Sequence, residues 1–255
     1  MPLTRKRAAF FDVDNTLVRG STIYFLGRGM YQRGFFTKAD ISRYVLANLR
    51  FKLTGTEKQE EILRFQNAAT DFIGGHNVAE IKEIGEAIYD EFVSPALWQG
   101  TIAIANEHSA RGEEVWLVTA APEDMAKLIS ARLGFTGAIG SKAAVKDGMY
   151  TGEMNGPLLH GKEKAMAIEE LALERGFDLS ECYAYSDSNN DLPLLQAVGH
   201  PSAINPDAIL RLRALREGWP IHDFRRMRFI NRLLGPIVSR VAALGTFLSF
   251  RRRSR

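Results

Sequence analysis

Two aspartates, Asp12 and Asp14, end a short apolar run near the start of the chain, within the segment FFDVDNTLV at positions 10–18. Residues 8–13 have the composition of a short, fully buried strand. Both carboxylates therefore stand where a strand ends, which is where open α/β sheets place their ligands. Unpaired buried charge is costly, and a divalent cation with a phosphate group would compensate it. The alternative is a strand-end turn with two solvated aspartates.

Three later points of the chain have the same kind of location, at a strand end or at the start of the following helix. Thr119 follows the strand pattern VWLV, Lys164 lies early in a helical segment, and the segment SDSNND at 186–191 follows the pattern CYAY. With the paired aspartates they provide a nucleophile, an acid, a hydroxyl, a cation and further acids. This set is sufficient for phosphoryl transfer through a covalent aspartyl-phosphate.

The elements that must position these residues alternate between strand and helix. Strands are predicted at 8–13, 114–119, 183–185 and 202–204, helices at 101–111, 122–133, 160–175, 192–198 and 207–217, and a hairpin at 143–152. This alternation predicts an α/β fold with a parallel sheet and helices on both faces.

Residues 22–97 show helical patterns with no strand between them. We therefore predict a helical cap domain that enters directly after the first strand. The predicted division is an α/β core at 1–20 and 98–218, a helical cap at 21–97, and a basic amphipathic tail at 219–255.

The motifs DVDNT and SDSNND, the strand end LVT and the lysine-bearing helix resemble, in order and spacing from about residue 8 to 205, the four motifs of the haloacid dehalogenase (HAD) superfamily. The helical insert is similar to the cap of its phosphoserine phosphatase-like branch, subfamily IB. The resemblance implies a Rossmann-like core and a Mg²⁺-dependent phosphomonoester hydrolase.

The resemblance also implies a role for each motif residue. Asp12 would attack phosphorus and carry the phosphoryl group, while Asp14 would protonate the leaving oxygen and then activate water. Mg²⁺ would be held by the Asp12 carboxylate, the Asp14 backbone carbonyl and the Asp187 carboxylate.

Further residues would hold the phosphate: Thr119, Ala120, Lys164 and Asn190 are the expected substrate contacts, with Thr119 and Lys164 also catalytic. Asp191 would orient Lys164 or the Asp187 loop. Lys162 is the alternative phosphate lysine, although its position in the helix favours Lys164.

The substrate is less well defined by the sequence. Phosphoserine phosphatases have a glutamate after the first motif that helps to select the amino acid, whereas the matching positions here are Gly20 and Ser21. The apolar and aromatic residues between 23 and 36 indicate either cap–core packing or an apolar entrance to the site.

The tail from residue 219 holds nine arginines and one aspartate in a chain of net charge +3. Its apolar residues share a helical face, but Arg232, Arg240 and Gly235-Pro236 argue against a membrane-spanning helix. We therefore expect residues 220–255 to contact an anionic membrane peripherally. The alternative is packing on the core or at a dimer interface. The tail's few aromatics are not interleaved for base stacking, so we expect no nucleic-acid partner.

The only cysteine, Cys182, excludes an internal disulfide and a multi-cysteine metal site. The basic start of the chain is not typical of a signal peptide, because Asp12 and Asp14 interrupt the apolar run.

We expect a cytoplasmic enzyme, with peripheral contact to the inner face of the membrane, that acts on a phospholipid or lysolipid phosphate. The alternatives are a soluble phosphatase of a small phosphorylated metabolite, a phosphotransferase, and a non-catalytic phosphate-binding module.

Overall fold

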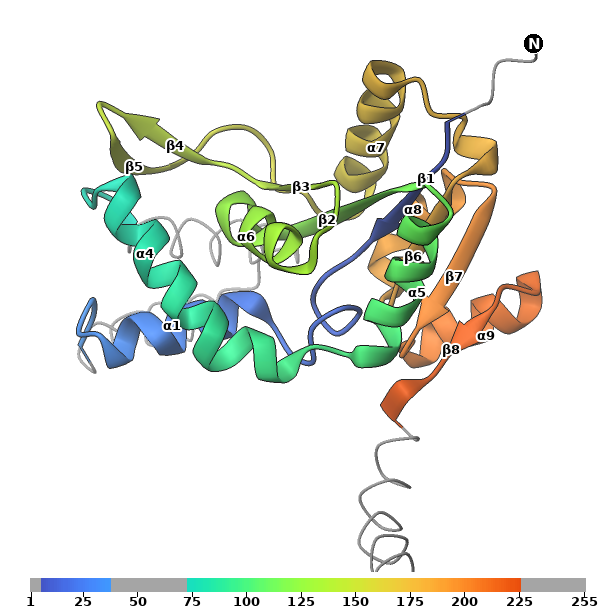
Figure 1. Ribbon diagram of the computed structural model, residues 1–255, viewed down its shortest axis with the longest axis horizontal. Coiled ribbons are helices and arrows are strands. Elements are labelled where there is room, and N and C mark those ends of the chain that lie inside the picture. The colour runs from blue at the N-terminus through green and yellow to red at the C-terminus, as the bar shows by residue number, and fades with distance from the viewer. Residues whose placement is uncertain (1–5, 38–72, 226–255) are drawn as a thin grey trace, which may run out of the picture.

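A computed structural model of the chain describes residues 6–37 and 73–225. Its main sheet has six strands in the order β3-β2-β1-β6-β7-β8, and the strands pair in parallel (Figure 1). The strands are β1 (Ala8–Phe11), β2 (Glu114–Pro122), β3 (Gly137–Ser141), β6 (Tyr183–Ser186), β7 (His200–Ile204) and β8 (Ile221–His222).

Both faces of the sheet are covered by helices. Successive side chains of a strand point to opposite faces, so Ala9 and Phe11 pack in one apolar cluster with α5 (Gln99–Ala110) and α6 (Glu123–Leu133). Ala8 and Phe10 pack on the other face with α7 (Lys162–Arg175), α8 (Leu192–Gln196) and α9 (Ala208–Glu217). This double burial explains why β1 is continuously apolar, and it confirms the predicted α/β architecture.

Two helices of the predicted cap, α1 (Thr22–Gln32) and α4 (Val78–Ile88), lie beside each other at one end of the molecule (Figure 1). A turn of π-helix (Tyr89–Val93) and a 3₁₀ turn (Ser94–Ala96) lead from α4 back toward the core. The middle of the predicted cap, residues 38–72, lies outside the described residues, and the boundaries of the cap domain stay a prediction.

The predicted hairpin is present as β4 (Ala143–Lys146) and β5 (Met149–Met154), joined at Asp147 and Gly148. Both turn residues have positive φ angles, 51° and 77°, as a two-residue hairpin turn requires. The hairpin also binds the cap: the Gly75 N–H donates to the Tyr150 carbonyl (2.8 Å), and the Tyr150 N–H donates to the His76 carbonyl (3.0 Å). These bonds tie the start of α4 to the core.

The edge strand β3 was not predicted, because its sequence GAIGS lacks the composition of a strand. Its two glycines permit close packing. A Cβ atom on Gly137 would lie 2.5 Å from the Trp116 ring, and one on Gly140 would lie 2.6 Å from the Glu123 Cα atom.

Within 6–37 and 73–225, no helix combines the length and the apolar character needed to cross a membrane. Most of the predicted amphipathic tail, residues 226–255, lies outside the described residues.

Candidate active site

The candidate site lies at the carboxyl end of β1, the strand at which the sheet order changes direction. β1 is flanked by β2 on one side and β6 on the other, so the connections that follow β2 and β6 diverge from this point. A crevice forms at such a position in open α/β sheets. The backbone N–H of Asp12 donates to the Tyr185 carbonyl (2.9 Å) and continues the β1–β6 pairing, which holds Asp12 at the strand end.

Lys164, in the first turn of α7, lies between two carboxylates. Its Nζ donates to Asp12 Oδ1 at 2.6 Å and to Asp191 Oδ2 at 2.7 Å. Ser186 Oγ donates to the same oxygen of Asp191 at 2.8 Å, a contact that the motif reading did not anticipate. The Lys164 side chain is only 3% exposed, whereas Lys162 is exposed. This placement favours Lys164 as the lysine that would meet a phosphate.

Lys164, Asp12 and Asp191 place one positive charge against two carboxyl groups in a buried position. Burial raises the pKa of Asp12 to about 7, although the neighbouring ammonium of Lys164 opposes this shift. Burial alone would lower the pKa of Lys164, but the Asp12 and Asp191 carboxylates raise it above its usual value. Lys164 is therefore a fixed positive charge beside the expected nucleophile.

Asp187 follows β6 and accepts a long hydrogen bond (3.4 Å) from Thr16 Oγ1. Burial, with repulsion from the Asp12 and Asp191 carboxylates, raises the pKa of Asp187 to about 8. Asp12 and Asp187 thus belong to one acidic cluster in which one lysine faces several carboxyl groups.

This cluster fits a hard divalent cation. In the described part of the chain no three His, Cys, Asp or Glu side chains group as a metal site, but the expected set needs only two. Asp12 and Asp187 would provide carboxylate oxygens, and Asp14 would provide a backbone carbonyl. Oxygen-only ligands with retained waters suit Mg²⁺, and a cation there would stabilise the ionised carboxylates, whose pKa values are raised first by burial and then by repulsion from other acids.

Asp14 is held by the first turn of the cap. Its Oδ1 accepts from the Thr22 N–H (2.9 Å) and the Thr22 hydroxyl (2.7 Å), and its Oδ2 accepts from the Ser21 hydroxyl (3.0 Å). The carboxylate thus caps the N-terminus of α1 from outside the helix. Sequence reasoning missed both partners, although a Ser-Thr pair before an apolar helix is a capping signal.

Replacing Thr22 with valine is expected to lower kcat about tenfold, because a hydrogen bond to a charged group contributes about 1.5 kcal/mol. The loss would follow from a less firmly oriented Asp14. Steady-state assays of Thr22→Val against Thr151→Val provide the check. Thr151 is exposed on β5, and its hydroxyl makes two backbone contacts away from the site, at 3.3 Å to the Ala144 carbonyl and at 3.2 Å from the Glu153 N–H. Equal kcat values in the two variants would contradict a positioning role for Thr22.

The remaining predicted contacts have different surroundings. Thr119 is 1% exposed, and its hydroxyl oxygen accepts from the Ala121 N–H (3.1 Å), which leaves its hydrogen available to donate. Ala120 borders a cavity, and its carbonyl accepts from Ser141 Oγ (2.8 Å). Asn190 is exposed, whereas the next residue, Asp191, is buried. Its role in phosphate binding stays a prediction.

The fold and these motif positions agree with the comparisons to known proteins. Residues 9–196 match the family of haloacid dehalogenase-like hydrolases. The chain belongs to this family. The predicted Rossmann-like HAD fold and the predicted enzyme class, a phosphoric monoester hydrolase, are thereby confirmed.

One relative and two solved structures show what the chain is similar to. The chain is 44% identical to phosphoserine phosphatase SerB1 of Mycobacterium tuberculosis, over 100% of this chain and 83% of the relative. It resembles a crystal structure of a Bordetella pertussis protein of unknown function, with a TM-score of 0.76 and 26% identity over 86% and 99% of the two chains. A substrate-bound phosphoserine phosphatase shares the fold, with a TM-score of 0.59 and 19% identity over 90% and 99% of the chains.

Proposed function

We propose that this HAD-family chain hydrolyses a phosphomonoester of a small molecule through an aspartyl-phosphate on Asp12. The observation that carries the proposal is the buried contact of Lys164 with Asp12, at 2.6 Å, at the carboxyl end of β1. A fixed ammonium next to a strand-end carboxylate both orients the nucleophile and offers charge to a transferring phosphoryl group.

The reaction divides into two transfers. In the first, Asp12 attacks phosphorus, the bond to the leaving alcohol oxygen breaks, and Asp14 gives that oxygen a proton. In the second, Asp14 takes a proton from water as the water attacks phosphorus, which releases phosphate and restores the Asp12 carboxylate. Lys164 and the Thr119 hydroxyl stabilise the equatorial oxygens. Asp12, the Asp14 carbonyl and Asp187 would hold Mg²⁺, which would neutralise charge between the nucleophile and the phosphate.

Phosphoserine is one candidate substrate, because a relative with 44% identity is named a phosphoserine phosphatase. At the positions after the first motif this chain has Gly20 and Ser21, and the Ser21 hydroxyl donates a hydrogen bond to Asp14.

The expected membrane contact of residues 220–255 stays a prediction.

The direct test is turnover of p-nitrophenyl phosphate with and without metal. We expect hydrolysis in millimolar Mg²⁺, loss of activity to background after treatment with EDTA, and recovery when Mg²⁺ is restored. The physical reason is the unbalanced acidic cluster of Asp12 and Asp187. Full activity in EDTA would contradict the magnesium proposal, and the absence of any turnover would contradict the phosphatase. Adding an alcohol and measuring its phosphate ester would distinguish a phosphotransferase.

A further inference from the structure

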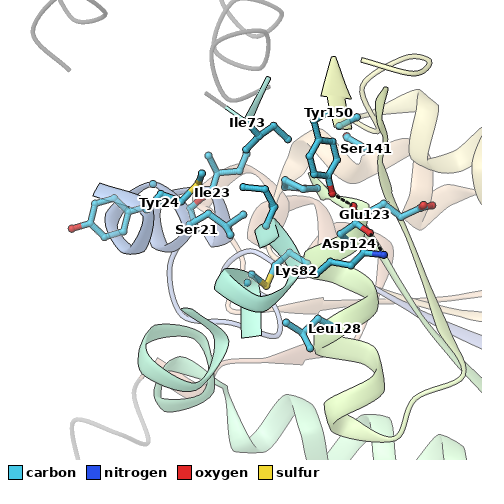
Figure 2. A pocket seen from close by; sticks show the side chains of 18 of the residues that line it. Ser21, Ile23, Tyr24, Ile73, Lys82, Glu123, Asp124, Leu128, Ser141 and Tyr150 are labelled. Carbon is cyan, nitrogen blue, oxygen red and sulfur yellow. Dashed lines mark hydrogen bonds and ion pairs between the residues drawn. The ribbon is translucent and has the colours of Figure 1, made fainter. Parts of the chain in front are cut away.

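A large cavity separates the cap from the core beside the candidate site. Its volume is about 850 Å³, and its lining includes Ala120, which follows Thr119 in the chain, and Ser21, whose hydroxyl donates to Asp14. Figure 2 shows Ser21 and other lining residues of this cavity. Its walls come from α1, α4, the start of α6 and the β4–β5 hairpin. This volume lies in the range of pockets that enclose a whole small-molecule ligand, roughly 300–1,000 Å³.

The cavity wall is mostly apolar, and most of its charged side chains have charged partners. Arg28 differs, because it is exposed and its guanidinium lies 5.0 Å from the centre of the Phe92 ring. The Lys82 ammonium lies 3.6 Å from Asp124, and Lys127 lies 2.8 Å from Glu123. Asp124 also accepts from the Tyr150 hydroxyl at 2.8 Å, as Figure 2 shows. A ligand with separate ammonium and carboxylate groups would compete with these pairs, whereas an uncharged apolar group would leave them intact.

The cavity lies on the side of the site where the leaving group emerges. Asp14 would protonate the leaving oxygen, and its carboxylate is bound by Ser21 and Thr22 at the start of α1. From there the cavity-lining residues Ile23, Gly27 and Met30 recur at helical spacing along α1. A leaving group that extends from Asp14 along this stripe enters the cavity directly.

We propose that the substrates are phosphomonoesters whose alcohol carries a bulky, uncharged apolar group, and that this group occupies the cavity between α1, α4 and the hairpin. The inference rests on the proposed phosphatase function and specifies its substrate class. The cavity is then the specificity pocket, with the phosphate held at Lys164 and the apolar group beyond Ser21 and Ala120.

A substitution at Gly27, which lines the cavity, can be used to fill this pocket. No atom lies within 4 Å of a Cβ placed on Gly27, so a side chain introduced there starts in open space. Leucine also has a higher helix propensity than glycine, so Gly27→Leu should not weaken α1. The matched control is Ala103→Leu, which places a leucine on an exposed position of α5 outside the cavity.

The test measures kcat/KM for ethyl, butyl and hexyl phosphate at concentrations below micelle formation. In the wild-type protein we expect kcat/KM to rise up to about fourfold for each methylene that the cavity buries, equivalent to about 0.8 kcal/mol. Gly27→Leu should reduce the ratio of hexyl to ethyl phosphate at least tenfold, while Ala103→Leu keeps the wild-type ratio. A flat series in the wild-type protein, or an unchanged ratio in Gly27→Leu, would overturn the inference.

Two further measurements separate the inference from the proposed function. Hydrolysis of ethyl phosphate with a flat chain-length series would leave the phosphatase intact and remove only the apolar pocket. Hexylphosphonate, which cannot be hydrolysed, reports binding by calorimetry even if no ester is turned over, and it should bind more tightly than ethylphosphonate. A monoacylglycerol phosphate in the same series distinguishes the source of the apolar group: turnover comparable to hexyl phosphate supports a lipid, and rejection supports a smaller apolar alcohol.

Discussion

Asp12→Asn is expected to lower phosphomonoester turnover by roughly 10⁴-fold or more, the scale of loss when a nucleophile is removed. The asparagine amide has nearly the shape of the carboxylate but cannot form the phosphoryl-enzyme bond. Lys164 keeps its contact with Asp191, so the fold should persist. The measurement is kcat with p-nitrophenyl phosphate in Mg²⁺, together with a thermal melt that shows the variant to be folded.

The matched control is Asp147→Asn, the same chemical change at an exposed turn position of the β4–β5 hairpin. Asparagine tolerates the positive φ of that residue, so activity and melting temperature should both stay at the wild-type value. Acid quenching during turnover should further trap a phosphoryl group on the Asp12 peptide of the wild-type protein. Retained activity in Asp12→Asn, or a phosphoryl group trapped elsewhere, would refute the assignment of the nucleophile.

The sequence predicted the sheet well because burial on both faces leaves a strong local signal. β1 is an uninterrupted apolar run and β2 contains the apolar run VWLV, and motif residues stand directly after both runs. β3 was missed because its glycines serve contacts with Trp116 and Glu123, which are tertiary and leave no strand pattern. The periodicity of apolar residues indicates which face of a helix or strand is buried. It does not indicate which other element will pack against that face.

In the site too, the sequence predicted what depends on local position and missed what depends on tertiary contacts. The position of Lys164 in its helix favoured it over Lys162, because one lysine turns toward the sheet and the other toward solvent. The hydrogen bonds from Ser21 and Thr22 to Asp14 depend on how the chain turns between β1 and α1, which motif spacing does not define.

The aromatic start of the cap left two interpretations open, core packing or an apolar entrance, and the structure contains both. Phe25 packs against the apolar cluster that contains Ala9 and Phe11, whereas Ile23 lines the cavity. Met30 does both. One amphipathic helix can serve two apolar surfaces when its apolar stripe is wide, so the pattern alone could not choose between them.

Lys164→Met is expected to lower the free energy of unfolding by about 3–5 kcal/mol, because it leaves buried carboxylates without their counter-charge. Asp12 and Asp191 are only 5% and 3% exposed, and both accept from the Lys164 ammonium. Urea unfolding of the metal-free protein measures the loss. Lys162→Met is the control, since it removes the same charge two residues earlier at an exposed position, and its effect should stay within about 0.5 kcal/mol.

The loss should depend on pH in a defined direction. Burial already raises the pKa of Asp12 to about 7, above its value in an unfolded chain, and removing the ammonium raises that pKa further. A carboxyl group with a raised pKa in the folded state favours unfolding once the unfolded chain ionises. Both proteins should therefore lose stability through Asp12 as pH rises from about 4 to 7, and the variant should go on losing it above about pH 7, where Asp12 of the wild-type protein ionises in the folded state. Adding Asp191→Asn to Lys164→Met removes one of the two uncompensated charges and should recover part of the stability. A Lys164→Met protein as stable as Lys162→Met at pH 7 would show that the lysine does not neutralise a buried acidic pair.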